Sequence, residues 1–80
     1  MANVGKNDPA RDAVAVTPSD TGNLGNVRSL YVGGAGDVSV VTAGGTTTVF
    51  SGVPAGGYVL CEVTRVRSTD TTATNIVALY

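Results

Sequence analysis

Side chains that could act in catalysis are scarce in this sequence of 80 residues, which has no histidine and one cysteine, Cys61. Histidine is the usual general base of a Ser-His-Asp or Cys-His relay and the commonest zinc ligand, so its absence argues against hydrolase and zinc chemistry. Four carboxylates, at Asp20, Asp37, Glu62 and Asp70, leave a glycosidase pair conceivable. These carboxylates fall mostly in predicted turns, and a thin core offers no deep cleft to raise a carboxyl pKa. We therefore expect that the protein is not an enzyme and binds no cofactor.

Two short motifs carry weaker chemical signals. The run GGAG at residues 33–36 resembles a phosphate loop superficially, but it leads into a predicted strand, whereas such loops need a helix amino terminus. Asp70, Thr71 and Thr72 offer oxygen atoms to a calcium ion, although one carboxylate is too few for a typical site. We interpret the first motif as a hairpin turn and the second as a turn whose side chains bond to local amides, and we predict no metal site.

Five residues are candidates for contacts between subunits because of their size and polarity: Tyr31, Tyr58, Arg65, Arg67 and Tyr80. The tyrosines could instead form a stacking platform for sugar or single-stranded nucleic acid, but no basic groove accompanies them. The two arginines could grip an acidic partner, and the competing interpretation is that they are solvated residues at a strand end. The sequence therefore predicts an assembly interface built on these five residues.

The composition favours a surface that is easily buried. Hydrophobic residues make up 42% of the chain and charged residues only 14%, and the net charge is −1. This balance gives no electrostatic footprint for nucleic acid or for an anionic membrane, so neither is an expected partner. A chain of this length allows one domain with a thin core, which association with other copies would stabilise.

The sequence also bears on where the protein is made. Its start lacks the apolar segment of a signal peptide, and no run approaches the roughly 18 apolar residues that cross a membrane as a helix. We expect synthesis in the cytoplasm and, if the chain is exported, export within a particle. Cys61 cannot form a disulfide within the chain, and we interpret it as a small apolar residue in a strand core.

Hydrophobic periodicity divides the chain into a charged, flexible arm at residues 1–12 and a β-domain at residues 13–80. Valine and threonine alternate in short runs separated by glycine turns, which predicts an all-β fold. The expected class is a small single-domain antiparallel β-sandwich or partly open barrel of about six short strands. These strands are predicted at residues 13–16, 27–32, 37–42, 46–50, 58–67 and 75–80.

The connections between these strands are predicted from turn chemistry. Residues 33–36 should join strands 27–32 and 37–42 as a hairpin, and Gly44-Gly45 should form a primed turn to the next strand, completing a meander. Within strand 58–67 the alternation fails near Thr64, where a β-bulge would return Val66 to the core; a twisted edge strand is the alternative. Leu24 is expected to hold a polar loop onto the core.

Three segments resemble the spike base protein family of tailed phages and gene transfer agents. They are AVAVTPSD (13–20), RSLYVGGAGDVSVVTAGGTTTVFSGVPAGG (28–57) and TTATNIVALY (71–80). The family pattern has an AVTPSD element before a loop, a strand ending in Tyr-Val-Gly, a Val-Pro-Ala-Gly turn, and a Gly-Thr-Thr-Ala-Thr turn before an apolar terminal strand. Asp70 stands where that pattern has glycine, which puts the geometry of the last turn in doubt.

The resemblance implies a non-catalytic virion structural protein without a cofactor. It implies that copies of the chain form an oligomeric base at the fivefold vertices of a capsid, and that a spike or fibre is mounted on this base. The expected oligomer is a pentamer. The implied partners are other copies of the chain, the major capsid protein and the spike or fibre protein, and the arm at residues 1–12 would order on docking into the capsid shell. A capsid decoration (cement) protein is the alternative, and a glycan-binding receptor module is less favoured. Ring order and the type of particle stay open.

Overall fold

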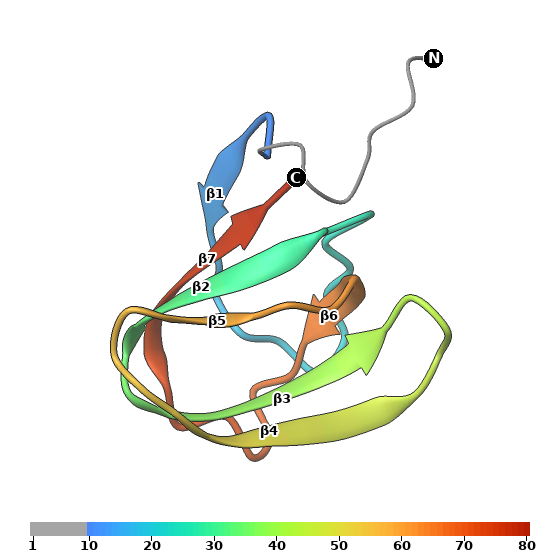
Figure 1. Cartoon of the computed structure of the whole chain (residues 1–80). Coiled ribbons are helices and arrows are strands. Elements are labelled where there is room, and N and C mark those ends of the chain that lie inside the picture. The colour runs from blue at the N-terminus through green and yellow to red at the C-terminus, as the bar shows by residue number, and fades with distance from the viewer. Residues whose placement is uncertain (1–9) are drawn as a thin grey trace.

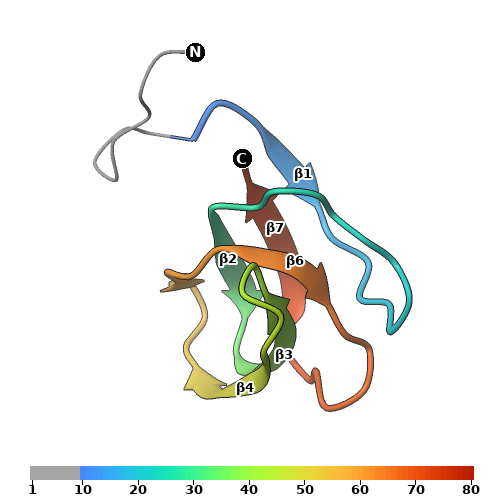
Figure 2. The ribbon, with the colours of Figure 1, turned by 90° about the vertical axis from the view of Figure 1, so that its right-hand side faces the viewer.

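The computed structural model describes residues 10–80, which form seven strands and no helix. The strands are β1 (Ala13–Ala15), β2 (Ser29–Gly34), β3 (Gly36–Thr42), β4 (Thr47–Val53), β5 (Gly57–Val59), β6 (Val63–Val66) and β7 (Thr74–Leu79). Sheet A has the order β1-β7-β2-β5 and sheet B the order β4-β3-β6, and all pairs are antiparallel. The two sheets enclose a common core (Figure 1, Figure 2). The predicted all-β, sandwich-like fold is confirmed, with one strand more than predicted.

The core between the sheets is thin and consists mainly of valine. Alternate residues of the central strands point inward, as a β-sheet buried on one face requires. Branched side chains pack well on such a pleated surface. Of the twelve buried hydrophobic residues in the described part of the chain, eight are valines; the set comprises Val27, Leu30, Val32, Val38, Val40, Val53, Val59, Val63, Val66, Ala73, Ile76 and Ala78. No helix in residues 10–80 is long and apolar enough to cross a membrane.

The loop at residues 17–26 closes one side of the sandwich. It runs along β6, where the amides of Ser19 and Leu24 donate to the carbonyls of Val66 and Thr64 at 2.8 and 2.7 Å. Leu24 packs against the core, as predicted. Val27, directly after the loop, forms a bridge with Val63 of sheet B. The β6 edge is therefore covered by the chain itself.

The predicted hairpin between strands 27–32 and 37–42 is wrong, and so is the meander that included it. Gly33 and Gly34 belong to β2, Gly36 begins β3, and the two strands lie in different sheets. The chain crosses between sheets here because Gly36 has no side chain: a Cβ there would lie 2.6 Å from the backbone nitrogen of Ala73. The run GGAG thus serves a close backbone approach between layers and not a turn within one sheet.

The hairpin between β3 and β4 is confirmed, but its turn differs from the prediction. The amide of Gly45 donates to the carbonyl of Thr42 at 2.9 Å, and Gly45, not Gly44, has a positive φ of 90°. This is the geometry of a three-residue connection in which a left-handed residue follows the turn, rather than a two-residue primed turn.

The predicted strand at 58–67 is two strands in two sheets. β5 ends at Val59 in sheet A, residues 60–62 cross over, and β6 begins at Val63 in sheet B. The predicted bulge at Thr64 is confirmed, because Thr42 pairs with Val63 while the adjacent Val41 pairs with Arg65. Val66 is consequently buried at 2% exposure. The irregularity in the alternation marked a real bulge, but the change of sheet just before it left no signal in the pattern.

The C-terminal strand, β7, is central in sheet A, between β1 and β2. The turn leading into it contains Asp70 with φ 67°, in the left-handed region. That conformation favours glycine, the residue expected at this position from the resemblance. Asp70 therefore holds a backbone conformation that glycine adopts readily.

Replacing Gly36 with alanine tests the close approach between layers. We expect Gly36→Ala to lower the free energy of unfolding by about 2–3 kcal/mol, because the added methyl meets backbone that must shift. Gly44→Ala is the matched control, since its Cβ would have only Thr42 Oγ1 at 3.8 Å nearby and its φ is not positive. Urea denaturation of both variants measures the difference. Equal stability of the two would contradict the account of this crossing.

Two substitutions at Asp70 test the strain in the last turn. Asp70→Gly should be as stable as the parent or more so, whereas Asp70→Val should be less stable than the glycine variant by about 1–2 kcal/mol, because a β-branched residue is disfavoured at positive φ. Thermal and urea denaturation report both values. A valine variant as stable as the glycine variant would show that the turn does not hold this residue in the left-handed region.

Candidate assembly interface

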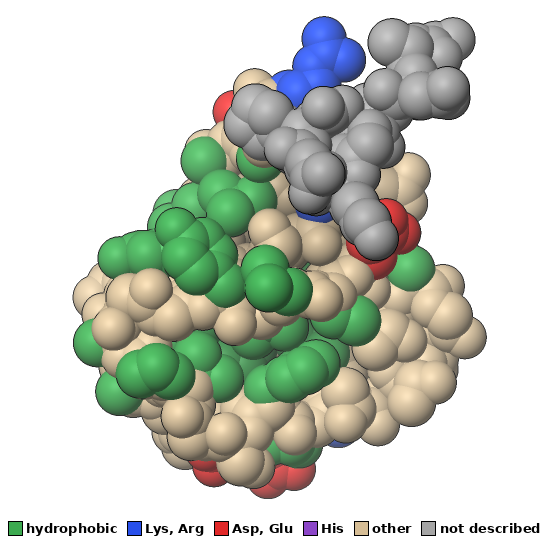
Figure 3. Space-filling view, in the orientation of Figure 1, with side chains coloured by type: hydrophobic (Ala, Val, Ile, Leu, Met, Phe, Trp, Pro, Cys, Tyr) green, Lys and Arg blue, Asp and Glu red, His purple; other side chains and the backbone are tan. Residues whose placement is uncertain are grey.

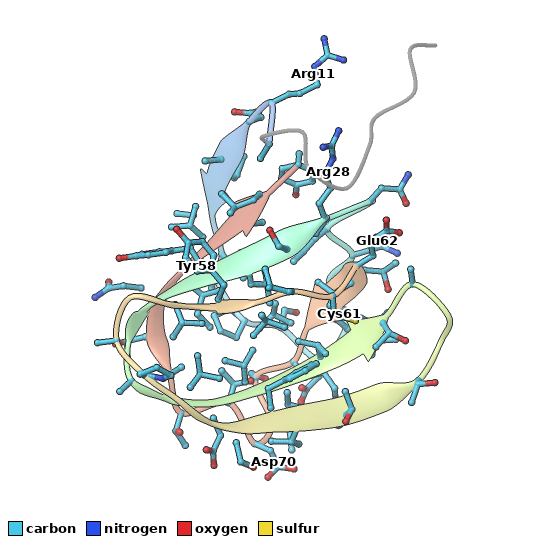
Figure 4. All side chains as sticks on the ribbon, in the orientation of Figure 1. Arg11, Arg28, Tyr58, Cys61, Glu62 and Asp70 are labelled. Carbon is cyan, nitrogen blue, oxygen red and sulfur yellow. The ribbon has the colours of Figure 1, made fainter. Side chains whose placement is uncertain are left out.

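Charged residues are almost absent from the strands. Only Asp37 in β3 and Arg65 in β6 are charged, and residues 38–61 contain no charged side chain. Sheet A and β4 are therefore entirely uncharged. The labelled charges of Arg11, Glu62 and Asp70 lie at the margins of the sheets, away from Tyr58 (Figure 4).

The outer side of sheet A carries a set of apolar residues that we call the apolar face. The register of β1, β2, β5 and β7 places its members on the side opposite the core. Hydrophobic side chains gather over these four strands in the space-filling view (Figure 3). The apolar face comprises Ala13, Ala15, Tyr31, Tyr58, Val77 and Leu79.

Two of the predicted interface residues meet on this face. Tyr31 and Tyr58 are direct cross-strand partners in β2 and β5, and their rings pack edge to face with centroids 5.4 Å apart. Tyr58 is 56% exposed. A large, half-exposed aromatic pair on an uncharged sheet surface is typical of a protein-protein contact.

Leu60 and Cys61, between β5 and β6, extend the uncharged surface at one corner, and the charged Glu62 follows them. Leu60 is 84% exposed, and sequence reasoning missed it because it was expected inside a continuous strand. Cys61 lies in this connection and not in a strand core, although it is partly buried against the core as a small apolar residue. Its thiol donates weakly to the carbonyl of Glu62 at 3.6 Å.

Tyr80 lies apart from the other two tyrosines. Its hydroxyl donates to the carbonyl of Leu24 at 2.8 Å, and its ring packs against the core. Tyr80 is thus on the core side of sheet A, whereas Tyr31 and Tyr58 are on its outer side. The three tyrosines do not form one stacking platform, which argues against a sugar or nucleic-acid site built on all three.

The two arginines contact the loop at residues 17–26. Arg65 Nε donates to the carbonyl of Gly22 at 2.9 Å, and Arg67 Nε lies 3.8 Å from Asp20 Oδ1. Both side chains therefore have partners within the chain. Their predicted role in assembly stays a prediction.

Asp20 links this loop to the turn that follows β6. Its Oδ2 accepts from the hydroxyl of Thr69 at 2.6 Å and its Oδ1 from the Thr69 amide at 2.9 Å. These two hydrogen bonds, with a smaller contribution from the charge of Arg67, hold the pKa of Asp20 below its ordinary value of 3.8. The carboxylate form is the one that fastens the loop.

The turn considered for calcium has a different role from the predicted one. The hydroxyl oxygens of Thr71 and Thr72 accept from the amides of Ser39 and Asp37, both at 2.9 Å, so they bond to a distant strand and not to local amides. Among residues 10–80, no three potential metal-ligating side chains lie together. The turn fastens β3 to the segment before β7.

Comparison with known proteins decides the family. No protein-family model matches the sequence, and no curated protein does. One solved structure, "Capsid of native GTA particle computed with C5 symmetry", where GTA denotes a gene transfer agent, contains a chain with 30% sequence identity and a TM-score of 0.83. The match covers 98% of this chain and 92% of that chain.

This chain belongs to the family of that capsid protein. The family is one of virion structural proteins, so the resemblance seen in the sequence is confirmed at that level.

Removing the Asp20 carboxylate tests the loop contact in this capsid-family protein. Because its pKa is lowered in the folded chain, its contribution to stability is fully present above pH 3.8 and is lost as the pH falls below that value. We expect Asp20→Asn to be less stable than the parent at neutral pH, with the difference narrowing towards about pH 2. Urea denaturation across this range is the measurement, and Glu62→Gln controls for the loss of one carboxylate. A difference that is constant over the range would contradict the assignment.

Proposed function

We propose that this protein is a non-catalytic structural subunit of a virion or gene transfer agent particle, and that it forms the pentameric base of a head spike or fibre at capsid vertices. The observation that carries the proposal is the match, over nearly the whole chain, to a subunit of a capsid with C5 symmetry. The sequence segments that resemble spike base proteins support the narrower role.

The physical properties of the chain support assembly into a ring. A closed ring of identical subunits buries two different surfaces on each copy. Burial of charge is expensive, and sheet A and β4 present surface without it. The thin valine core leaves a domain of this size with limited stability of its own, so burial of the apolar face in an assembly adds what the core lacks.

The proposal assigns partners and location. The partners are other copies of this chain, the major capsid protein and the spike or fibre protein, and the protein resides at the capsid vertex after synthesis in the bacterial host cytoplasm. Of the five residues predicted for the interface, Tyr31 and Tyr58 are those whose position on the apolar face supports a contact with another subunit.

A capsid decoration (cement) protein is the second candidate, because membership of a capsid protein family favours it as well. A cement protein would occupy many lattice positions and stabilise the shell. A glycan-binding receptor module has less support, since Tyr80 lies on the opposite side of sheet A from Tyr31 and Tyr58.

The mass of the purified full-length protein in solution tests the proposed ring. Native mass spectrometry and analytical ultracentrifugation should show a discrete species of five subunits that dissociates on dilution. Tyr58→Glu should weaken this species by about tenfold or more, since it places a charge in the buried surface, whereas Asn26→Glu, at an exposed position of the loop at residues 17–26, should not. A monomer at every concentration would overturn the proposal. Stable trimers or dimers would favour the cement protein.

A further inference from the structure

β4 is an edge strand whose first part, residues 47–50, has none of the features that normally protect such an edge. Within residues 10–80 it pairs only with β3. Its seven residues, Thr47–Val53, include no proline and no charged side chain. The one irregularity, a register shift opposite Gly36 and Val38, lies towards its end. Natural edge strands are usually short, bulged or charged, because an open edge invites pairing with another strand.

Hydrogen bonding in β3 shows which groups of β4 are open. The amide of Thr42 donates to the carbonyl of Thr46, on the β4 side of β3. The carbonyl of Ser39 accepts from the backbone amide of Arg67, on the opposite side of β3. Because main-chain groups alternate along an antiparallel pair, those of Thr48 and Phe50 face β3. Those of Thr47 and Val49 face away from it. The side chain of Val49 is 41% exposed.

Among the residues that the structure describes, β1 is a second open edge. The carbonyl of Asp12 accepts from the amide of Tyr80, and the amide of Val16 donates to Ile76. By the same alternation, the carbonyl of Ala13 and both main-chain groups of Ala15 point away from β7. All residues of β1 are exposed. β1 and β4 are the outer strands of different sheets and lie at opposite ends of the molecule (Figure 1).

We propose that β4 of one copy pairs with β1 of the next copy, head to tail, so that neighbouring subunits share a continuous sheet. This inference rests on the proposed ring and names the two surfaces that form it. The occupant of the β4 edge is a second copy, because a ring needs two different surfaces on each subunit. Within residues 10–80, β1 and β4 are uncharged open edges at opposite ends of the molecule (Figure 1), whereas β5, the other outer strand of sheet A, contacts β4 of its own chain.

The alternation of side chains agrees with this pairing. Ala15 pairs with Val77 within sheet A, which places its side chain on the apolar face. Val49 pairs with Ser39, between the inward-facing Val38 and Val40, so its side chain is on the outer side of sheet B. The open main-chain groups of both strands thus belong to residues with outward side chains. If β4 of one copy pairs with β1 of the next, the outer side of sheet B in the first copy and the outer side of sheet A in the second form one continuous surface.

Cross-linking between copies tests the pairing directly. In a Cys61→Ser background, the double variant Ala15→Cys/Val49→Cys is treated with a short bis-maleimide. We expect covalent species of increasing size that end at five chains. A mixture of the two single variants, the matched control, should give dimers only. Cross-linked dimers from Val49→Cys alone would overturn the inference, because they show a twofold pairing of β4 with β4.

Amide hydrogen exchange of the unmodified chain gives a second readout. The amides of Thr47 and Val49 should exchange at least about tenfold more slowly in the assembled species than in dilute monomer. Those of Thr48 and Phe50, which bond to β3, should be protected in both and serve as internal controls. A ring of five in which the Val49 amide remains unprotected, or in which the double variant does not cross-link, overturns this pairing and leaves the proposed function standing. A chain that is monomeric at every concentration overturns both.

Discussion

The fold depends on one direct contact between backbones, where the start of β3 meets the segment before β7. The carbonyl of Asp37 accepts from the amides of Thr72 and Ala73 at 2.9 and 3.1 Å. The amide of Asp37 in turn donates to Thr72 Oγ1 at 2.9 Å. Gly36 permits this approach because it has no Cβ to separate the two chains. The contact joins sheet B to the strand at the centre of sheet A, so the two layers keep their spacing over a core made mostly of valine.

The predominance of small and β-branched side chains in the strands also determines where charge lies on the surface. Residues that are small or β-branched build thin sheets, and the charges are left to the loops, to Asp37 and to Arg65. The loop at residues 17–26 covers the β6 edge. Arg65 and Arg67 contact this loop, and Asp20 within it bonds to the turn that follows β6. The apolar face and the β4 edge have no such cover among residues 10–80. A protein with this division of surface is suited to a place between other subunits, which agrees with its membership of a capsid protein family.

Sequence patterns predicted most strands correctly but not their partners. Runs rich in valine and threonine between turn residues located β1, β2, β3, β4 and β7, and the failed alternation located the bulge at Thr64. The pattern could not show that the chain changes sheet at Gly36 and again at residues 60–62, because a strand has the same period of two in either sheet. For this reason Leu60 was expected inside a strand. The predicted arm at residues 1–12 lies mostly outside the described residues, and its described end bonds to Tyr80 through Arg11 and Asp12.

Of the five predicted interface residues, two lie on the apolar face and three contact a loop of the same chain. Size and polarity identified Tyr31 and Tyr58, which the structure brings together on the apolar face. The same criteria could not separate them from Tyr80, Arg65 and Arg67, whose partners are residues of a loop far away in the sequence. Long-range contacts of this kind leave no local signal. The open edge of β4 was equally hidden, since it becomes apparent only when the order of strands in each sheet is known.

The most direct test of the central claim is a cryo-electron microscopy map of the intact particle with this chain located in it. The account predicts five copies around each occupied fivefold vertex, with the apolar face and the β4 edge buried against neighbouring subunits. Single copies distributed over the capsid lattice, with Tyr58 and β4 facing solvent, would contradict it.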